Sequence, residues 1–187
     1  MVAPVKKRLL TINEYRRMGE VGIFHEDDRV ELIRGEIYEL TPITNPHAAC
    51  LRRLNSVFKN VEDAILSPQN PVALEAQGSE PLTDLALLRF QEDFYRSAHP
   101  GPGAVLLAIE VSDSSLVYDR NIKVPLYTES GILETWIVDL NGDVVLVFRE
   151  PSPGGYKEER AFRRGETISP LAFPGLSVAV DAILGTC

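Results

Sequence analysis

Little in the sequence points to a secreted or membrane-bound protein. It has only two cysteines, Cys50 and Cys187, and no CxxC pair, so it predicts neither a disulfide framework nor a thiolate zinc site. No segment approaches the run of about 18 apolar residues that a membrane-spanning helix needs. The basic start, MVAPVKKRLL, lacks the apolar stretch of a secretory signal. We therefore expect a reduced, cytoplasmic protein without membrane contact.

Positive charge is also scarce, since 19 lysines and arginines stand against 27 acidic residues and the net charge is −8. Proteins that bind nucleic acid usually carry a basic surface, because neutralised phosphates release counterions. The acidic balance argues against tight DNA binding by this chain alone. It does not exclude a DNA enzyme, because an acidic metal site adds negative formal charge.

The remaining composition is that of a folded protein, with 44% hydrophobic and 25% charged residues in 187. This length suits one domain over residues 1–187, with a core over about residues 10–150 and a C-terminal β extension over 151–187. The order of predicted elements indicates an α/β domain with a mixed central sheet and a helix on each side.

The N-terminal part predicts a short helix followed by a β-hairpin. Thr11 and Glu14 form a capping-box pattern at the start of a helix that reaches Met18. The segment RVELIRGEIYEL then predicts two strands around a turn at Arg34-Gly35. Both elements precede the expected core and decorate it.

A longer helix and a series of strands are predicted to form the core. Apolar residues at three- and four-residue steps favour a helix over Pro46–Leu66, with Asn45 as its cap and Ser67-Pro68 as its end. The remaining pattern predicts strands over 71–76, 83–89, 104–111, 133–140 and 143–148, and a helix over 119–130. From Glu150 onward we expect short strands and Pro/Gly turns.

Two acidic residues in apolar strands predict a site. Glu110 stands near the end of the apolar run AVLLAIEV, and Asp84 opens the strand LALL. A buried carboxylate costs several kcal/mol unless it is paired or binds a metal. Two such carboxylates on neighbouring strands would form an oxygen-ligand site for a hard cation, Mg²⁺ or Mn²⁺. A lysine nearby could stabilise charge on a phosphate or orient a water.

Several motifs in their order and spacing resemble the Uma-two family, which is assigned to restriction endonucleases of the PD-(D/E)XK superfamily. The resemblance covers about residues 10–150. Its residues are Glu31-Leu32-Ile33-Arg34-Gly35-Glu36, His47, Pro81-Leu82-Thr83-Asp84-Leu85, Ala108-Ile109-Glu110-Val111-Ser112-Asp113-Ser114-Ser115, Asp119-Arg120-Asn121-Ile122-Lys123, Tyr127, Gly131 and Glu134-Thr135-Trp136-Ile137-Val138-Asp139.

The resemblance implies a restriction-endonuclease-like fold, Mg²⁺ or Mn²⁺ dependence and a DNA substrate. It makes Asp84 and Glu110 the metal-binding acids. It places the catalytic lysine on the following helix, as Lys123, and makes Glu31 and His47 accessory residues of the same site. Thr83 replaces the proline of the superfamily pattern, and Ser112 stands where that pattern has its lysine. We also expect a homodimer or a higher homo-oligomer, because nucleases of this size often need two copies to cut both strands.

Each of these residues also has a structural interpretation. Glu110 could be a salt-bridged acid at a strand end, and Asp84 an ordinary acid before a strand. Lys123 and Glu31 could be solvated, and His47 could be an exposed residue of the first helical turn. Two other functions therefore stay open. One is an interaction module that kept the fold without catalysis, and the other is a metal phosphodiesterase for small molecules.

Overall fold

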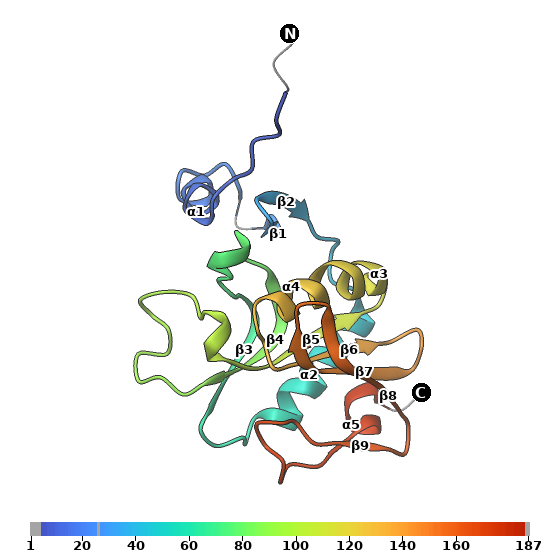
Figure 1. Cartoon of the computed structure of the whole chain (residues 1–187). Helices are drawn as coiled ribbons and strands as arrows, with labels where there is room; N and C mark the ends of the chain where they lie inside the picture. Colours follow the sequence, from blue (N-terminus) through green and yellow to red (C-terminus); the bar gives the residue numbers. More distant parts are fainter. Residues whose placement is uncertain (1–4, 26, 186–187) are drawn as a thin grey trace.

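A mixed six-stranded β-sheet forms the centre of the protein in the computed structural model, which describes residues 5–25 and 27–185 (Figure 1). The strand order is β3-β4-β5-β6-β7-β8. β5 and β6 are parallel, and every other neighbouring pair is antiparallel. The strands are β3 (Ala64–Pro71), β4 (Leu82–Arg89), β5 (Val105–Ser112), β6 (Glu134–Asp139), β7 (Val144–Ser152) and β8 (Gly155–Arg163).

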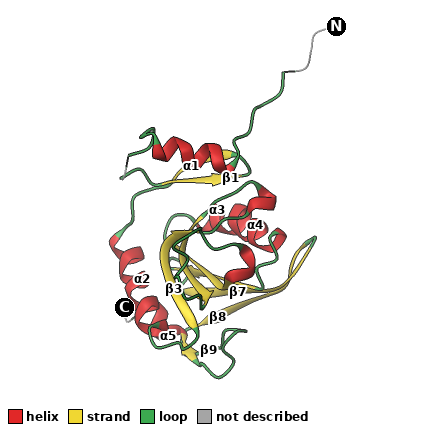
Figure 2. Ribbon diagram, turned by 90° about the vertical axis from the view of Figure 1, so that its left-hand side faces the viewer, coloured by secondary structure: helices red, strands yellow, loops and turns green. Residues whose placement is uncertain are grey.

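Helices cover both faces of this sheet (Figures 1 and 2). One face carries α2 (Asn45–Phe58) and α5 (Val180–Leu184), with the short pair β9 (Thr167–Ile168) and β10 (Val178–Ala179) beside them. The other face carries a continuous helical run of α3 (Leu116–Tyr118), the π-helical η3 (Asp119–Lys123) and α4 (Val124–Glu129). The predicted mixed sheet between helices is confirmed.

The N-terminal helix and hairpin form a further layer outside the sheet and its helices (Figure 2). Helix α1 (Ile12–Glu20) begins with the predicted capping box. The hairpin of β1 (Val30–Ile33) and β2 (Glu36–Glu39) turns at Gly35 with φ of 78°. A Cβ there would lie 2.8 Å from the carbonyl oxygen of Leu10, so the turn requires glycine. This part of the prediction is confirmed.

The long helix ends earlier than its apolar pattern predicts. Helix α2 stops at Phe58, and Asp63 adopts a left-handed conformation with φ of 61° that turns the chain into β3. The prediction that the helix reaches Leu66 is therefore wrong. The apolar pattern continues because a strand follows, and Ile65 packs against the opposite face of the sheet. β3 can contain Pro68 because it is an edge strand with one hydrogen-bonded neighbour.

Two other local predictions differ from the structure. The strand expected over 71–76 is absent, because β3 ends at Pro71 and a 3₁₀ turn, η1, covers Glu75–Gln77. The C-terminal third contains the helix α5 beside its strands, which packs against α2.

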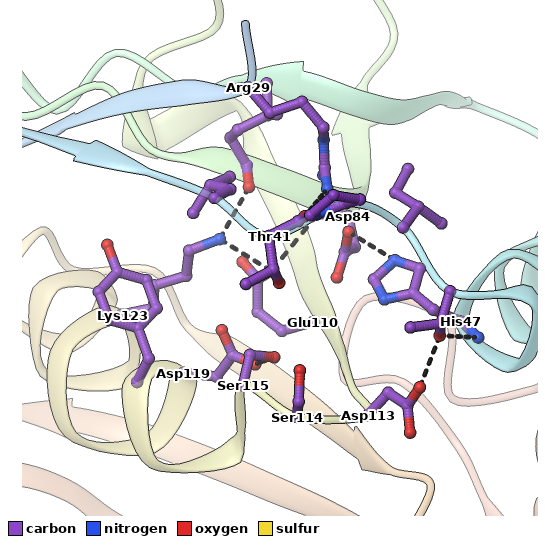
Figure 3. Close-up of a pocket in the computed structure, with 16 residues that line it drawn as sticks. Arg29, Thr41, His47, Asp84, Glu110, Asp113, Ser114, Ser115, Asp119 and Lys123 are labelled. Carbon is purple, nitrogen blue, oxygen red and sulfur yellow. Dashed lines mark hydrogen bonds and ion pairs between the residues drawn. The ribbon is translucent and has the colours of Figure 1, made fainter.

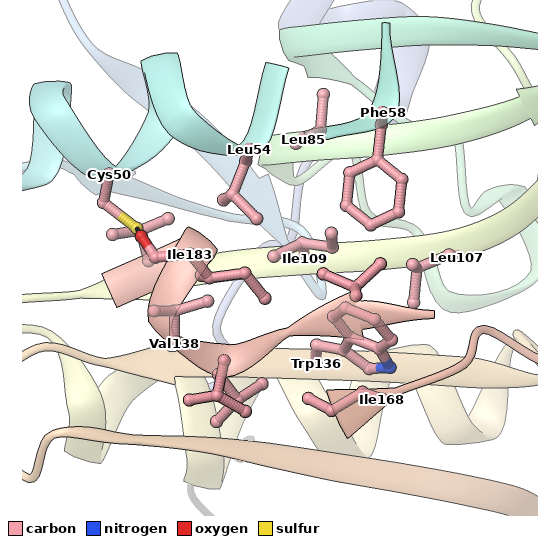
Figure 4. Packing of buried hydrophobic residues seen from close by; sticks show 14 of the residues in the cluster. Cys50, Leu54, Phe58, Leu85, Leu107, Ile109, Trp136, Val138, Ile168 and Ile183 are labelled. Atoms are coloured by element: carbon pink, nitrogen blue, oxygen red, sulfur yellow. Dashed lines mark hydrogen bonds between the residues drawn. The ribbon is translucent and has the colours of Figure 1, made fainter. Parts of the chain in front are cut away.

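The larger core lies between the sheet and the α2/α5 layer. Figure 4 shows Leu54 and Phe58 of α2 and Ile183 of α5 directed at the strands, with Trp136 of β6 among them. Alternate residues of β4 and β5, such as Leu85 and Ile109, enter this core. The residues between them therefore face the helical run on the other side of the sheet.

A buried acid away from that run joins β6 to the C-terminal segment. Glu134 is fully buried and accepts hydrogen bonds from Trp136 Nε1 at 2.9 Å, Arg149 Nη2 at 2.7 Å and the backbone amide of Leu171 at 2.6 Å. These contacts tie β6 to β7 and to the C-terminal segment.

Candidate active site

Asp84 and Glu110 lie side by side on the sheet face that the helical run covers. In the antiparallel pair β4–β5, Leu85 is opposite Ile109, so Asp84, just before Leu85, lies beside Glu110, just after Ile109. The backbone amide of Asp84 lies 3.5 Å from Glu110 Oε2. The amide of Val111 donates to Asp84 Oδ2 at 2.9 Å. The two strands therefore fix both carboxylates at one place, as the sequence predicts.

Glu110 is 1% exposed, and protein groups meet both of its carboxylate oxygens. Tyr127 donates its hydroxyl to Oε1 at 2.5 Å, and Lys123 Nζ donates to Oε2 at 3.1 Å. Burial raises the pKa of Glu110 well above its usual range, Lys123 acts against this shift, and the neighbouring Asp84 adds to it. A cation beside Glu110 would remove much of the cost of its charge.

Lys123 comes from η3 and is 4% exposed. Its ammonium donates to the carbonyl oxygen of Leu82 at 2.8 Å and to Glu110, and it lies 3.4 Å from Glu31 Oε2. Burial alone would lower the pKa of Lys123, but the carboxylates of Glu110 and Glu31 raise it well above its usual range. Lys123 is therefore a fixed positive charge between two buried acids.

Glu31 reaches this cluster from the hairpin and has no exposed surface. The amide of Leu82 donates to its Oε2 at 2.8 Å, and the hydroxyl of Tyr118 donates to its Oε1 at 2.6 Å. The hairpin acid is thus not solvated, although Glu39 on the same hairpin is exposed. Glu31 therefore links the N-terminal hairpin to the start of β4 and to the helical run.

His47 approaches from α2, near the amino end of that helix. Its Nε2 lies 3.0 Å from Asp84 Oδ1, and both side chains are largely buried. Thr44 caps the helix by accepting from the amide of His47, so the prediction that Asn45 is the cap is wrong by one residue. All five site residues predicted from the sequence therefore meet at one place, and their roles stay predictions.

The structure adds residues that the sequence reasoning assigned no role. Asp119 is buried and accepts hydrogen bonds from Ser112 at 2.6 Å and Ser115 at 2.5 Å. Burial raises its pKa, and Lys123 and the two hydroxyls act against the shift. Ser112, two residues after Glu110, thus supplies a hydroxyl that orients Asp119. Asp119 and Tyr127 each stand four residues from Lys123, a spacing that could have placed all three on one helix face.

A pocket opens above this cluster (Figure 3). The figure shows Arg29 on one side, Asp113, Ser114, Ser115 and Asp119 on the other, and Asp84 and Glu110 between them. The segment between β2 and α2 contributes further lining residues, namely Leu40, Thr41, Pro42, Ile43 and Thr44. Four carboxylates line the pocket, and two lysine or arginine side chains oppose them, so its charge favours a cation.

The donor set suits a hard, partly hydrated cation. Asp84 and Glu110 offer carboxylate oxygens from rigid strands. Asp84 Oδ1, Asp84 Oδ2 and Glu110 Oε1 each accept one of the contacts described above, so each retains a lone-pair direction. Among the described residues, no group of three or more His, Cys, Asp or Glu side chains could hold a metal ion. Zn²⁺ in a closed protein site needs four such ligands, whereas Mg²⁺ is held by one or two carboxylates and keeps several waters.

No helix within the described ranges is both long and apolar enough to cross a membrane. The sequence expectation of no membrane contact rests on the same absence of long apolar segments.

A family model described as "Putative restriction endonuclease" (Uma2) matches residues 12–181. Among solved structures, the chain is similar to a crystal structure from Anabaena variabilis described as "a putative nuclease belonging to DUF820". The TM-score is 0.71 with 16% sequence identity, over 94% of this chain and 97% of that chain. At this identity the likeness shows a shared fold. No curated protein matches the chain.

Proposed function

The chain belongs to the Uma2 family of restriction-endonuclease-like proteins, and from this premise we propose that it is a metal-dependent endonuclease that hydrolyses phosphodiester bonds of DNA. The observation that supports the proposal best is the pair Asp84 and Glu110, held together on two strands beneath an acidic pocket. Glu110 is buried with a raised pKa and lies within reach of Lys123, a combination typical of reactive sites.

In this proposal Asp84 and Glu110 would hold Mg²⁺ or Mn²⁺. The chemistry that such a cation supplies, when bound, is activation of water and stabilisation of charge that develops on a phosphate. His47 would fix the orientation of the Asp84 carboxylate through its Nε2 contact at 3.0 Å. Tyr127 would do the same for Glu110 from the opposite side.

Lys123 would keep Glu110 ionised and in place. Three oxygens surround its ammonium, those of Leu82, Glu110 and Glu31. To orient a water or stabilise a phosphate directly, it would have to release one of these partners. Glu31 would therefore act on the site through Lys123, because its carboxylate lies 3.4 Å from the ammonium.

Cleavage of supercoiled plasmid DNA tests this proposal. The wild-type protein should nick or linearise the plasmid with Mn²⁺ or Mg²⁺ and should leave it intact with EDTA. Asp84→Asn and Glu110→Gln should each lower the rate at least about 100-fold, because a bound metal supplies several kcal/mol of charge stabilisation. Glu158→Gln, which removes an exposed acid on β8, should cut like the wild type.

The net charge of −8 favours a second candidate function, that of a non-catalytic interaction module. That candidate predicts no cleavage and no stabilisation by Mn²⁺. Hydrolysis of bis(p-nitrophenyl) phosphate without cleavage of DNA would instead identify a phosphodiesterase for small molecules. The homodimeric assembly and the cytoplasmic location stay predictions, which size-exclusion chromatography with light scattering and cell fractionation can check.

A further inference from the structure

The acidic pocket raises the question of which group receives an anionic substrate. Asp84, Glu110, Asp113 and Asp119 line it, and the ammonium of Lys123 is buried among three oxygens. A phosphodiester that enters the pocket therefore approaches several negative charges and meets no free ammonium. Among the described lining residues, the remaining lysine or arginine is Arg29.

Arg29 is held at the base of the hairpin, on the side of the pocket opposite Asp119 (Figure 3). Its carbonyl oxygen accepts from the amide of Leu40 at 2.7 Å, and its Nη1 donates to the carbonyl oxygen of Thr41 at 2.7 Å. The backbone on both sides of the hairpin thus sets the position of the guanidinium. The adjacent hairpin strand is fixed to the site in turn, because Glu31 bonds to Leu82 and Tyr118.

The guanidinium keeps most of its hydrogen-bonding capacity. An arginine carries five N–H donors, and within the described ranges Thr41 provides the acceptor for Arg29. No carboxylate of the described residues forms an ion pair with it, although acids line the same pocket. The side chain is half-buried and so can face an entering ligand. A planar guanidinium matches the two non-bridging oxygens of a phosphodiester.

We propose that Arg29 binds the phosphate backbone of the DNA substrate beside the pair Asp84 and Glu110. This inference rests on the proposed function and names the residue that selects an anionic substrate at that site. It assigns to Arg29 the direct phosphate contact that the buried Lys123 does not make. The competing interpretation is structural, in which Arg29 only closes the hairpin through Thr41.

The test compares Arg29→Gln and Arg29→Lys with Arg17→Gln, which removes the same charge from an exposed position on α1. Plasmid cleavage with Mn²⁺ is measured over a range of DNA concentrations. Arg29→Gln should raise the DNA concentration at half-maximal rate about 10-fold, because a charge-assisted phosphate contact is lost. The rate at saturating DNA should stay within about 3-fold, since the metal ligands are intact. Arg29→Lys should recover part of the affinity.

Binding of a fluorescent DNA duplex in Ca²⁺, measured by anisotropy at several salt concentrations, separates this inference from the proposed function. Arg29→Gln should reduce the slope of log binding constant against log salt concentration by about one, and Arg17→Gln should not. If the wild-type protein binds DNA without cutting it, the endonuclease proposal is refuted. The role of Arg29 is then decided by the DNA affinity of the variants alone. The inference is overturned if Arg29→Gln matches Arg17→Gln in both assays, or if the wild type does not bind DNA. It is also overturned if Arg29→Gln lowers Tm and the rate at saturating DNA but leaves DNA affinity unchanged.

Discussion

Replacing the buried lysine of the site should destabilise the protein strongly. In Lys123→Met the two acids beside the ammonium, Glu110 and Glu31, stay in place with 1% and 0% exposure. Removing one partner of a buried ion pair costs about 3–5 kcal/mol, because the other charge is left without compensation. For a domain of this size, that corresponds to a fall in Tm of about 6–20 °C.

Urea unfolding measures this change with a natural reporter. The single tryptophan, Trp136, is fully buried in the core on the opposite face of the sheet, so its fluorescence reports global unfolding. Lys157→Met, at an exposed position of β8, provides the control and should cost less than about 0.5 kcal/mol. A double-mutant cycle with Glu110→Gln should give a coupling energy above about 1 kcal/mol.

The destabilisation should also depend on pH in a defined direction. Lys123 normally opposes the upward shift of the Glu110 pKa, so its loss raises that pKa further. The folded variant then binds a proton more readily than the unfolded chain, and its stability should rise as pH falls through the folded pKa toward about 4.3. If Lys123→Met loses less than about 1 kcal/mol at pH 7 and shows no such recovery, the two acids carry no charge and the electrostatic reasoning is refuted.

Three further changes separate the roles of neighbouring groups. His47→Ala should weaken Mn²⁺ binding about 10–100-fold without unfolding the protein, because it removes the contact that orients Asp84; calorimetric titration checks this. Tyr127→Phe removes a bond that lowers the Glu110 pKa, so the acid limb of the pH–rate profile for DNA cleavage should move to higher pH. Glu134→Gln should cost about 2–4 kcal/mol in urea unfolding and leave Mn²⁺ affinity unchanged, because its partners are structural.

The strands of the site could be predicted from sequence because they depend on short, local patterns. An acid in the apolar run of β5 and another at the start of β4 identify two unfavourable burials, and antiparallel pairing brings them together. Local apolar spacing does not predict where α2 ends. Its apolar spacing continues to Ile65, and only the left-handed turn at Asp63 shows that the last part is a strand.

The contacts around the acids depend on long-range packing, so local sequence patterns do not predict them. Glu31 reaches Leu82 across 51 positions, and Tyr118 reaches Glu31 across 87. The π-helical segment also sets the rotation of Lys123 relative to α4. The resemblance to a known family predicts that Glu31, His47 and Lys123 belong to the site. It does not predict that three oxygens surround the ammonium of Lys123.

Direct measurement of Mn²⁺ binding tests the central claim, that Asp84 and Glu110 together hold a divalent cation. Isothermal titration of the wild-type protein should show one strong site per chain. Asp84→Asn and Glu110→Gln should each abolish it, and Glu158→Gln should bind like the wild type. Equal Mn²⁺ binding by all four proteins, or none by the wild type, would contradict the account.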